Sequence, residues 1–181
     1  MKKVRSVIII VICAALCIGY YYYLSNRDSG KNAAPTEKEQ VISKDLEQSY
    51  PTTPREVIKF YNRILLCLYN EENSEAEIEA LGAQARNLMD EELLEQNPEE
   101  IYLSSLQLET SQFAEDKKQI ISVTISTSKE VEYEEIDDVE YAYVESSYYI
   151  KGEDDSERAG QTYILRKNKK GRWKILGYYR P

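Results

Sequence analysis

The chain has 181 residues, enough for one domain beyond a short N-terminal segment, and its formal net charge is −9. Residues 32–181 hold 31 of the 32 acidic residues, and an acidic domain of this kind repels a phosphate backbone, which excludes nucleic acid as a partner. It also repels anionic lipids and polymers unless local basic patches or divalent cations intervene. The chain has no histidine, which excludes Ser-His-Asp and Cys-His catalysis and every histidine-bearing zinc site.

The first 24 residues predict a transmembrane signal anchor. Residues 1–5 are basic, and residues 7–24 carry no charge. Eighteen residues of helix reach about 27 Å, close to the thickness of one hydrocarbon core. The positive-inside rule places the N-terminus in the cytoplasm and the C-terminal domain outside a single-pass span, and the tyrosines at 20–23 fit an interfacial belt. A cleaved signal peptide is the alternative, although no small-residue cleavage site follows Gly19.

The cysteines predict no disulfide. Cys13 and Cys17 lie in the apolar segment, and neither follows the small residues that lipoprotein processing needs. Cys67 is the only cysteine beyond that segment, so it has no intramolecular partner in the domain. It lies in an apolar helical run, and we expect it to be a small buried side chain, not a nucleophile.

Residues 25–52 are predicted to form a flexible tether, because they are polar and hold few residues that could be buried. Val41, Ile42 and Leu46 are compatible with a short marginal helix near its end. The extracytoplasmic domain is predicted for residues 53–181.

The domain begins with a strong helix signal. Thr53 is a typical N-cap, Pro54 suits the first helical position, and Glu56 completes a capping box. We expect a helix over residues 54–69, and we expect Leu65→Ala to cost about 2–5 kcal/mol if Leu65 lies in the core. The residues at helical spacing are Val57, Phe60, Tyr61, Ile64, Leu65 and Leu68.

Three further helices are predicted from their start signals. Ser74 and Glu77 form a second capping box, Asp90 is a third N-cap, and Asn97 precedes a proline and two glutamates. The predicted helices cover residues 75–88, 91–96 and 98–113.

From Gln119 the hydrophobic period changes from 3.6 to 2, which is typical of strands. A turn is predicted at residues 136–138, and Gly171 supplies the positive φ of a tight hairpin turn. The predicted strands cover residues 119–133 with a bend at 127–129, then 139–150, 161–167 and 173–178. The fold class is therefore α+β, with three to four helices packed on a curved four-stranded antiparallel sheet.

This order resembles the nuclear transport factor two-like (cystatin-like) fold, a cone in which helices pack into a curved sheet. The resemblance covers residues 53–181 and rests on the helix that starts at Thr53 and on the final hairpin, residues 163–178. The whole chain is also similar to uncharacterised, membrane-anchored proteins of Gram-positive bacteria. The family includes isomerases, dehydratases and non-catalytic binding domains, and its enzymes typically use an Asp or His inside the cone. The resemblance implies a fold, not an activity.

Tyrosine is the residue type that best suggests a site, since the chain has 16. If tyrosines line the concave face, the cone could hold a ring-bearing ligand; if they fill it, they are core residues, which strand propensity favours. Tyr133 and Tyr178 are less certain members, and Arg166 is expected either to pair with Glu145 or to recognise a ligand charge. The cone-lining candidates are Tyr61, Tyr141, Tyr143, Tyr163 and Arg166.

The densest carboxylate clusters, at residues 137–138 and 153–157, fall at predicted turns and lack the spacing of an EF-hand. We interpret them as solvated loops, with calcium binding as the alternative. No metal, cofactor or catalytic residue is predicted.

These features favour a non-enzymatic accessory or binding domain held at the outer face of the cell membrane by residues 7–24. A small-molecule-binding cone and a lyase or isomerase are the alternatives. The expected partner is a protein or cell-envelope component, and a homodimer formed through the sheet is a further option; nucleic acid is not expected.

Overall fold

The computed structural model describes residues 34–180, so the predicted anchor at residues 1–24 lies outside the described part of the chain. Residues from Glu37 onward form one unit of α+β architecture, in which five helices and five strands are described. Between residues 34 and 180, no helix combines the length and the apolar character that a membrane crossing requires.

Helix α3, Pro54–Asn70, begins as predicted with a complete capping box. The backbone N of Glu56 donates to the Thr53 hydroxyl at 3.2 Å, and the backbone N of Thr53 donates to the Glu56 carboxylate at 3.3 Å. Its buried apolar residues include Val57, Ile58, Phe60, Ile64, Cys67 and Leu68.

The other predicted helices are also present. They are α4, Glu75–Arg86, α5, Glu91–Gln96, and α6, Glu99–Glu115. Ser74 caps α4 in a second capping box, and Asp90 caps α5 by accepting from the backbone N of Glu92 at 3.1 Å. Local start signals thus place α3, α4 and α5 well, because a cap satisfies donors within one turn of the chain. The expected cap of α6 was wrong: Asn97 ends α5, and Pro98 is the N-cap of α6 without a side-chain hydrogen bond.

The sheet is antiparallel and has five strands, so the prediction of four was wrong. The strands are β1, Gln119–Ile125, β2, Glu132–Ile136, β3, Val139–Lys151, β4, Ser156–Lys167, and β5, Trp173–Tyr179. Their order is β1-β3-β4-β5, and β2 pairs with the opposite half of β3 from β1. Residues 119–133 were predicted as one bent strand, but they form two strands because the long β3 offers separate pairing sites along one edge.

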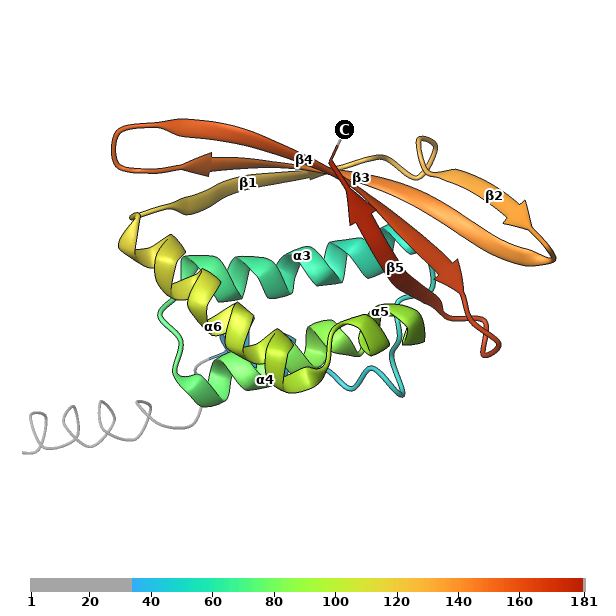
Figure 1. Cartoon of the computed structure of the whole chain (residues 1–181), viewed down its shortest axis with the longest axis horizontal. Helices are drawn as coiled ribbons and strands as arrows, with labels where there is room; N and C mark the ends of the chain where they lie inside the picture. Colours follow the sequence, from blue (N-terminus) through green and yellow to red (C-terminus); the bar gives the residue numbers. More distant parts are fainter. Residues whose placement is uncertain (1–33, 181) are drawn as a thin grey trace, which may run out of the picture. The chain divides into compact units, whose positions relative to one another are not determined.

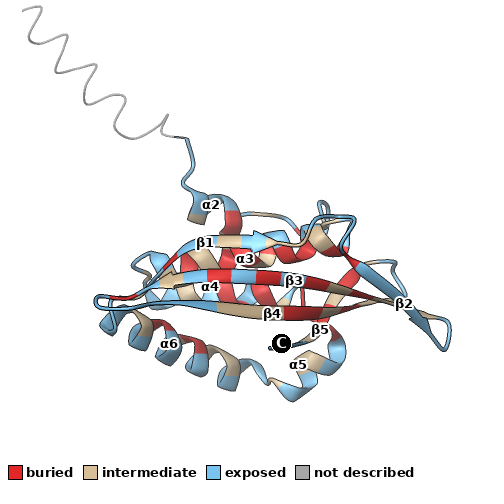
Figure 2. Ribbon diagram, turned by 90° about the horizontal axis from the view of Figure 1, so that it is seen from above, coloured by how far each residue is buried: buried red, intermediate tan, exposed pale blue. Residues whose placement is uncertain are grey.

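Helices cover one face of this sheet, and the core lies between the two layers. Figure 1 shows α3 running beneath the strands, with α4 and α6 farther from the sheet. Figure 2, seen from above, shows buried segments of β3 and β4 in front of the helices. On β3, Ala142, Val144, Ser146 and Tyr148 are buried, while alternate residues face outward. We call the helix-covered side the inner face and the other side the outer face.

The folded unit starts earlier than the sequence predicts. Helix α2, Glu37–Ile42, lies in the segment predicted as tether, yet Val41 is fully buried and Leu46 is 6% exposed. Both belong to the main core, and α2 contacts α3 and α4. Two apolar residues are enough to hold this polar segment on the domain, because both are buried in the core beside α3 and α4.

Ile64 and Leu65 give a direct test of the packing of α3. Ile64 is fully buried, whereas Leu65 is only partly buried and lies outside the core cluster. We therefore expect Ile64→Ala to lower the free energy of unfolding by about 2–5 kcal/mol, and Leu65→Ala by clearly less, contrary to the expectation from periodicity. Urea denaturation of both variants measures the difference, and equal losses would contradict this packing.

Candidate functional site

The tyrosines on the inner face form a buried hydrogen-bond network. The Tyr148 hydroxyl donates to the Asn62 amide oxygen at 2.6 Å and lies 2.7 Å from the Tyr163 hydroxyl. The Tyr163 hydroxyl also lies 2.7 Å from the Gln161 amide oxygen, and the Asn62 amide donates to the Ser146 hydroxyl at 3.2 Å. We call Asn62, Ser146, Tyr148, Gln161 and Tyr163 the inner tyrosine network.

Burial governs the chemistry of this network. It raises the pKa of Tyr148 and of Tyr163 above the usual value, because a phenolate loses its hydration there. The rings of Tyr61 and Tyr178 pack against the Tyr163 ring at centroid distances of 5.7 and 5.9 Å. Tyr163 is 2% exposed and belongs to the hydrophobic core. Of the two alternatives, lining an open cone or filling the core, Tyr163 therefore fits the second.

The predicted site residues do not share one face. Tyr163 pairs with Val144 and points inward, whereas Tyr141 and Tyr143 occupy the alternate, outward positions of β3. The Tyr143 hydroxyl donates to the Glu134 carboxylate at 2.9 Å on the exposed side. Tyr61 contacts Tyr163 on the inner face, and Tyr141 lies opposite Arg166 across β3 and β4 on the other, so strand parity divides the five residues into separate groups.

Arg166 pairs with Asp90 and Glu92, and not with Glu145, which lies opposite Thr162. Its Nε donates to Asp90 Oδ2 at 3.1 Å, and its Nη2 donates to Asp90 Oδ1. The hydrogen bond to Asp90 is the main cause that raises the pKa of Arg166. Asp90 is 5% exposed, so this two-pronged pair fixes the start of α5 against β4.

A groove of about 920 Å³ lies between residues 44–50, the α4–α5 region and the β4–β5 hairpin. We call it the basic groove, because eight basic and four acidic residues line it although the chain as a whole is acidic. Sequence reasoning missed it, although six of its eight cations lie within residues 166–174, because the other two and the remaining walls come from distant segments. The basic residues are Lys44, Arg86, Arg166, Lys167, Lys169, Lys170, Arg172 and Lys174.

Tyr50 organises one wall of the basic groove. Its hydroxyl donates to the backbone O of Trp173 at 2.7 Å. The Arg172 guanidinium lies 5.0 Å and Lys174 Nζ lies 4.7 Å from the centre of its ring. These cation–π contacts hold two cations near one another, and Arg172 also pairs with Glu47 at 3.1 Å.

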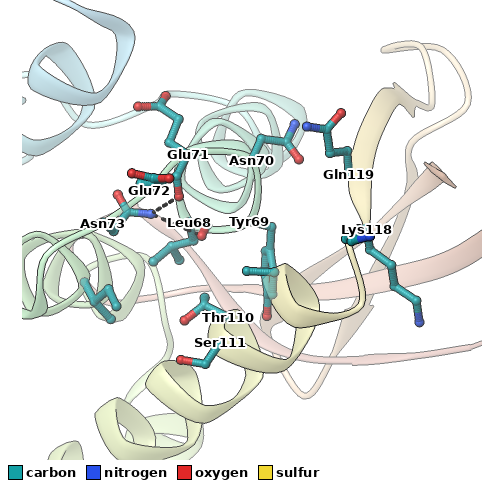
Figure 3. Close-up of a pocket in the computed structure, with 13 residues that line it drawn as sticks. Leu68, Tyr69, Asn70, Glu71, Glu72, Asn73, Thr110, Ser111, Lys118 and Gln119 are labelled. Carbon is teal, nitrogen blue, oxygen red and sulfur yellow. Dashed lines mark hydrogen bonds between the residues drawn. The ribbon is translucent and has the colours of Figure 1, made fainter. Parts of the chain in front are cut away.

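A second cavity, of about 440 Å³, lies where α3 and α6 end and β1 begins (Figure 3). The Asn73 amide donates to the backbone O of Glu71 at 2.8 Å, and Asn70 exchanges two hydrogen bonds of 2.8 Å with the backbone of Ile120. Because these amides are engaged in joining chain segments, we assign this cavity a structural role.

The carboxylates at residues 137–138 and 153–155 lie at turns, as predicted, but Glu157 belongs to β4, which begins at Ser156, earlier than expected. Asp137 and Asp138 have φ of 50° and 62° in the tight turn between β2 and β3. Glu153 pairs with Lys117 at 2.7 Å on the exposed surface. Within residues 34–180 there is no group of three or more Cys, Asp or Glu side chains placed to hold a metal ion.

The fold and these sites define an α+β domain with a hydrophobic core that encloses the inner tyrosine network, and with a basic groove at its surface. Residues 1–178 match the model of a protein family described as a domain of unknown function, DUF6715, and the chain belongs to that family. The matched region includes the N-terminal apolar segment together with nearly all of the folded unit. A comparison with curated proteins found no match.

The buried tyrosines predict a loss of stability at alkaline pH. Burial raises the pKa of Tyr102 to about 12 and also raises the pKa of Tyr61, Tyr148 and Tyr163, so the folded chain keeps protons that an unfolded tyrosine releases near pH 10. The stabilisation is complete below about pH 10 and falls as the pH rises above it, by up to about 1.4 kcal/mol per pH unit for each such tyrosine.

Urea denaturation at pH 8, 10 and 11 measures this effect. We expect Tyr163→Phe to lose about 1–3 kcal/mol at pH 8, because it leaves its partners without a hydrogen bond, and to show a shallower alkaline decline. Tyr149→Phe, on the outer face, is the matched control. An alkaline decline of the same slope in both variants would contradict the assignment.

Proposed function

We propose that this chain is a non-enzymatic accessory or binding domain held at the outer face of a cell membrane by its N-terminal segment. The observation that carries the proposal is the division of the sheet into an inner face that the helices cover and an outer face over which Figure 1 shows no helix of the described residues, apart from the β4–β5 end where Arg166 and Lys174 contact residues 87–92. The inner tyrosine network uses its hydroxyls internally, and its members have no carboxylate among their hydrogen-bond partners. A buried acid–base pair, which a lyase or isomerase would use, therefore has no support in this network.

The outer face supplies the binding surface in this proposal. By strand register, Tyr143, Tyr149 and Tyr179 occupy outward positions of β3 and β5, whereas Tyr141 lines the basic groove beside Arg166 and is not part of this surface. Tyr149 and Tyr179 are 36% and 49% exposed. Tyrosine is enriched at protein interfaces because its ring adds contact area and its hydroxyl can pair with a partner. A protein or envelope component, or a second copy of the chain, is the proposed occupant.

We also propose that the domain is a nuclear transport factor two-like cone. A long helix lying along the inner face of a bent antiparallel sheet supports this interpretation (Figure 1). In that family the enzymes use an Asp or His within the cone; here the buried inward positions of β3 carry Ala142, Val144, Ser146 and Tyr148. The fold proposal and the non-enzymatic proposal are thus compatible.

Reporter fusions test the membrane topology. Alkaline phosphatase joined after Pro181 should be active in cells, because the enzyme folds only outside the cytoplasm, whereas β-galactosidase at the same place should be inactive. Removing residues 2–24 should move the protein from the membrane fraction to the soluble fraction and abolish phosphatase activity. An active β-galactosidase fusion would overturn the proposed orientation.

Photo-cross-linking in cells tests the outer face as a binding surface. A benzoylphenylalanine at Tyr149 should give discrete higher-mass adducts, and a band of twice the chain mass would identify a second copy. Leu108 on α6 is the matched control, since it is also exposed, at 59%, but lies on a helix on the other side of the sheet. Equal adducts at both positions, or none at Tyr149, would argue against this interface.

A further inference from the structure

We propose that the basic groove binds a ligand that carries several phosphate groups. The inference is independent of the outer-face interface, because it rests on different residues and makes no use of the membrane anchor. It is carried by the shape of the groove, by its local excess of positive charge and by the way its cations are held in place.

The charge of the groove is opposite to that of the chain. Eight basic residues line it in a protein of net charge −9. Arg166, Lys167 and Arg172 are compensated by ion pairs with carboxylates. Among the described residues, the other five basic side chains of the groove have no carboxylate within ion-pair distance. They are Lys44, Arg86, Lys169, Lys170 and Lys174. Gathering like charges costs free energy, and an anion bound between them would offset that cost.

Lys174 shows this lack of compensation most clearly. Its side chain is partly buried, and its Nζ donates to the backbone O of Asn87 and lies over the Tyr50 ring. Burial and the neighbouring Arg172 lower the pKa of Lys174, and the carboxylates of Glu47 and Asp90 offset this only in part. A phosphate group beside Arg172 and Lys174 would supply the missing negative charge.

The hairpin that carries Lys169 and Lys170 is fixed before any ligand arrives. The Asn168 side chain accepts from the backbone N of Lys170 and of Arg172, both at 3.0 Å. Gly171 has a φ of +73°, which a residue with a side chain rarely adopts, and its backbone N donates to the backbone O of Asn168 at 2.8 Å. A rigid turn lowers the entropy cost of placing its cations around a ligand.

The chemistry of the cations and the size of the groove favour several phosphates over one small anion. Arginine matches phosphate oxygens through its planar fork, and lysine adds point charges. About 920 Å³ is the volume of a pocket for a ligand of many atoms, and the cations are distributed from Lys44 to the β4–β5 hairpin. A string of carboxylates is the competing ligand class, and it carries less charge per group.

Isothermal titration calorimetry of the full chain in dodecyl maltoside, at low salt, tests the proposal with tripolyphosphate. We expect saturable binding that weakens about tenfold in Lys169→Gln/Lys170→Gln. Both lysines are exposed on the hairpin, so the variant should fold normally, as its thermal melt will show. Lys129→Gln/Lys151→Gln removes two exposed lysines outside the groove and is the matched control.

Three further titrations define the ligand. Dihexanoyl phosphatidylglycerol, used below its micelle concentration, tests a lipid headgroup as the phosphate source, with dihexanoyl phosphatidylcholine as its neutral control. Groove-dependent binding of tripolyphosphate supports the proposal, and its absence would overturn it even where the lipid binds. Phosphatidylglycerol carries one phosphate, so groove-dependent binding of this lipid as tight as that of tripolyphosphate would overturn the requirement for several phosphates and identify a lipid headgroup. Polyglutamate binding as tight as that of tripolyphosphate would overturn it in favour of an acidic peptide. An equal loss in the control variant, or no binding of either phosphate compound, would overturn it as well.

Discussion

The packing of α3 on the sheet is the interaction on which the rest of the structure depends. The N-terminal end of α3 is hydrogen-bonded to the residue after β1, and its C-terminal end is hydrogen-bonded to β1 itself. Arg55 Nε donates to the backbone O of Ser126 at 2.9 Å, and Asn70 exchanges two hydrogen bonds with Ile120. The helix is therefore held along the full length of β1, and α2, α4 and α6 contact its remaining surface. With its position fixed, its buried residues can fill the space beneath β3 and β4.

A polar residue in the middle of this helix sets how the two layers meet. Asn62 is 3% exposed, and its burial would cost free energy if its amide were not paired. Tyr148 and Ser146, two residues apart on β3, supply the partners. A shift of the helix by one residue would break both contacts, so the inner tyrosine network favours a single register. The same network engages the hydroxyls of Tyr148 and Tyr163 within the protein, which is why the two proposed binding surfaces lie elsewhere, on the outer face and in the basic groove.

The sequence was sufficient where structure is decided within a few residues. The capping boxes at Thr53 and Ser74 and the cap at Asp90 mark three helix starts, because each satisfies donors in its own first turn. The sequence was insufficient where a residue's contact partner is distant along the chain. Arg166 is 76 residues from Asp90, and the division of residues 119–133 into two strands depends on the length of β3. Periodicity placed Val57, Phe60, Ile64 and Leu68 on the buried face correctly. It also included Leu65, which is only partly buried, and left out Ile58, which is fully buried, because apolar residues occur around much of that helix.

A basic groove in an acidic domain has a different selectivity from a basic surface. At physiological ionic strength a charge is felt over about 8 Å, so beyond the groove an approaching polyanion meets the negative charge of the surrounding domain. A uniformly basic protein attracts polyanions of every shape, whereas here only an anion that fits between Tyr50 and the β4–β5 hairpin can contact Lys174 together with the exposed lysines of the hairpin. The acidic remainder of the chain thus rejects non-specific ligands by repulsion, while the groove supplies attraction at short range. The excess of acidic residues disfavours polyanion binding over most of the surface. In this proposal it therefore increases the specificity of the groove for the one ligand that fits there.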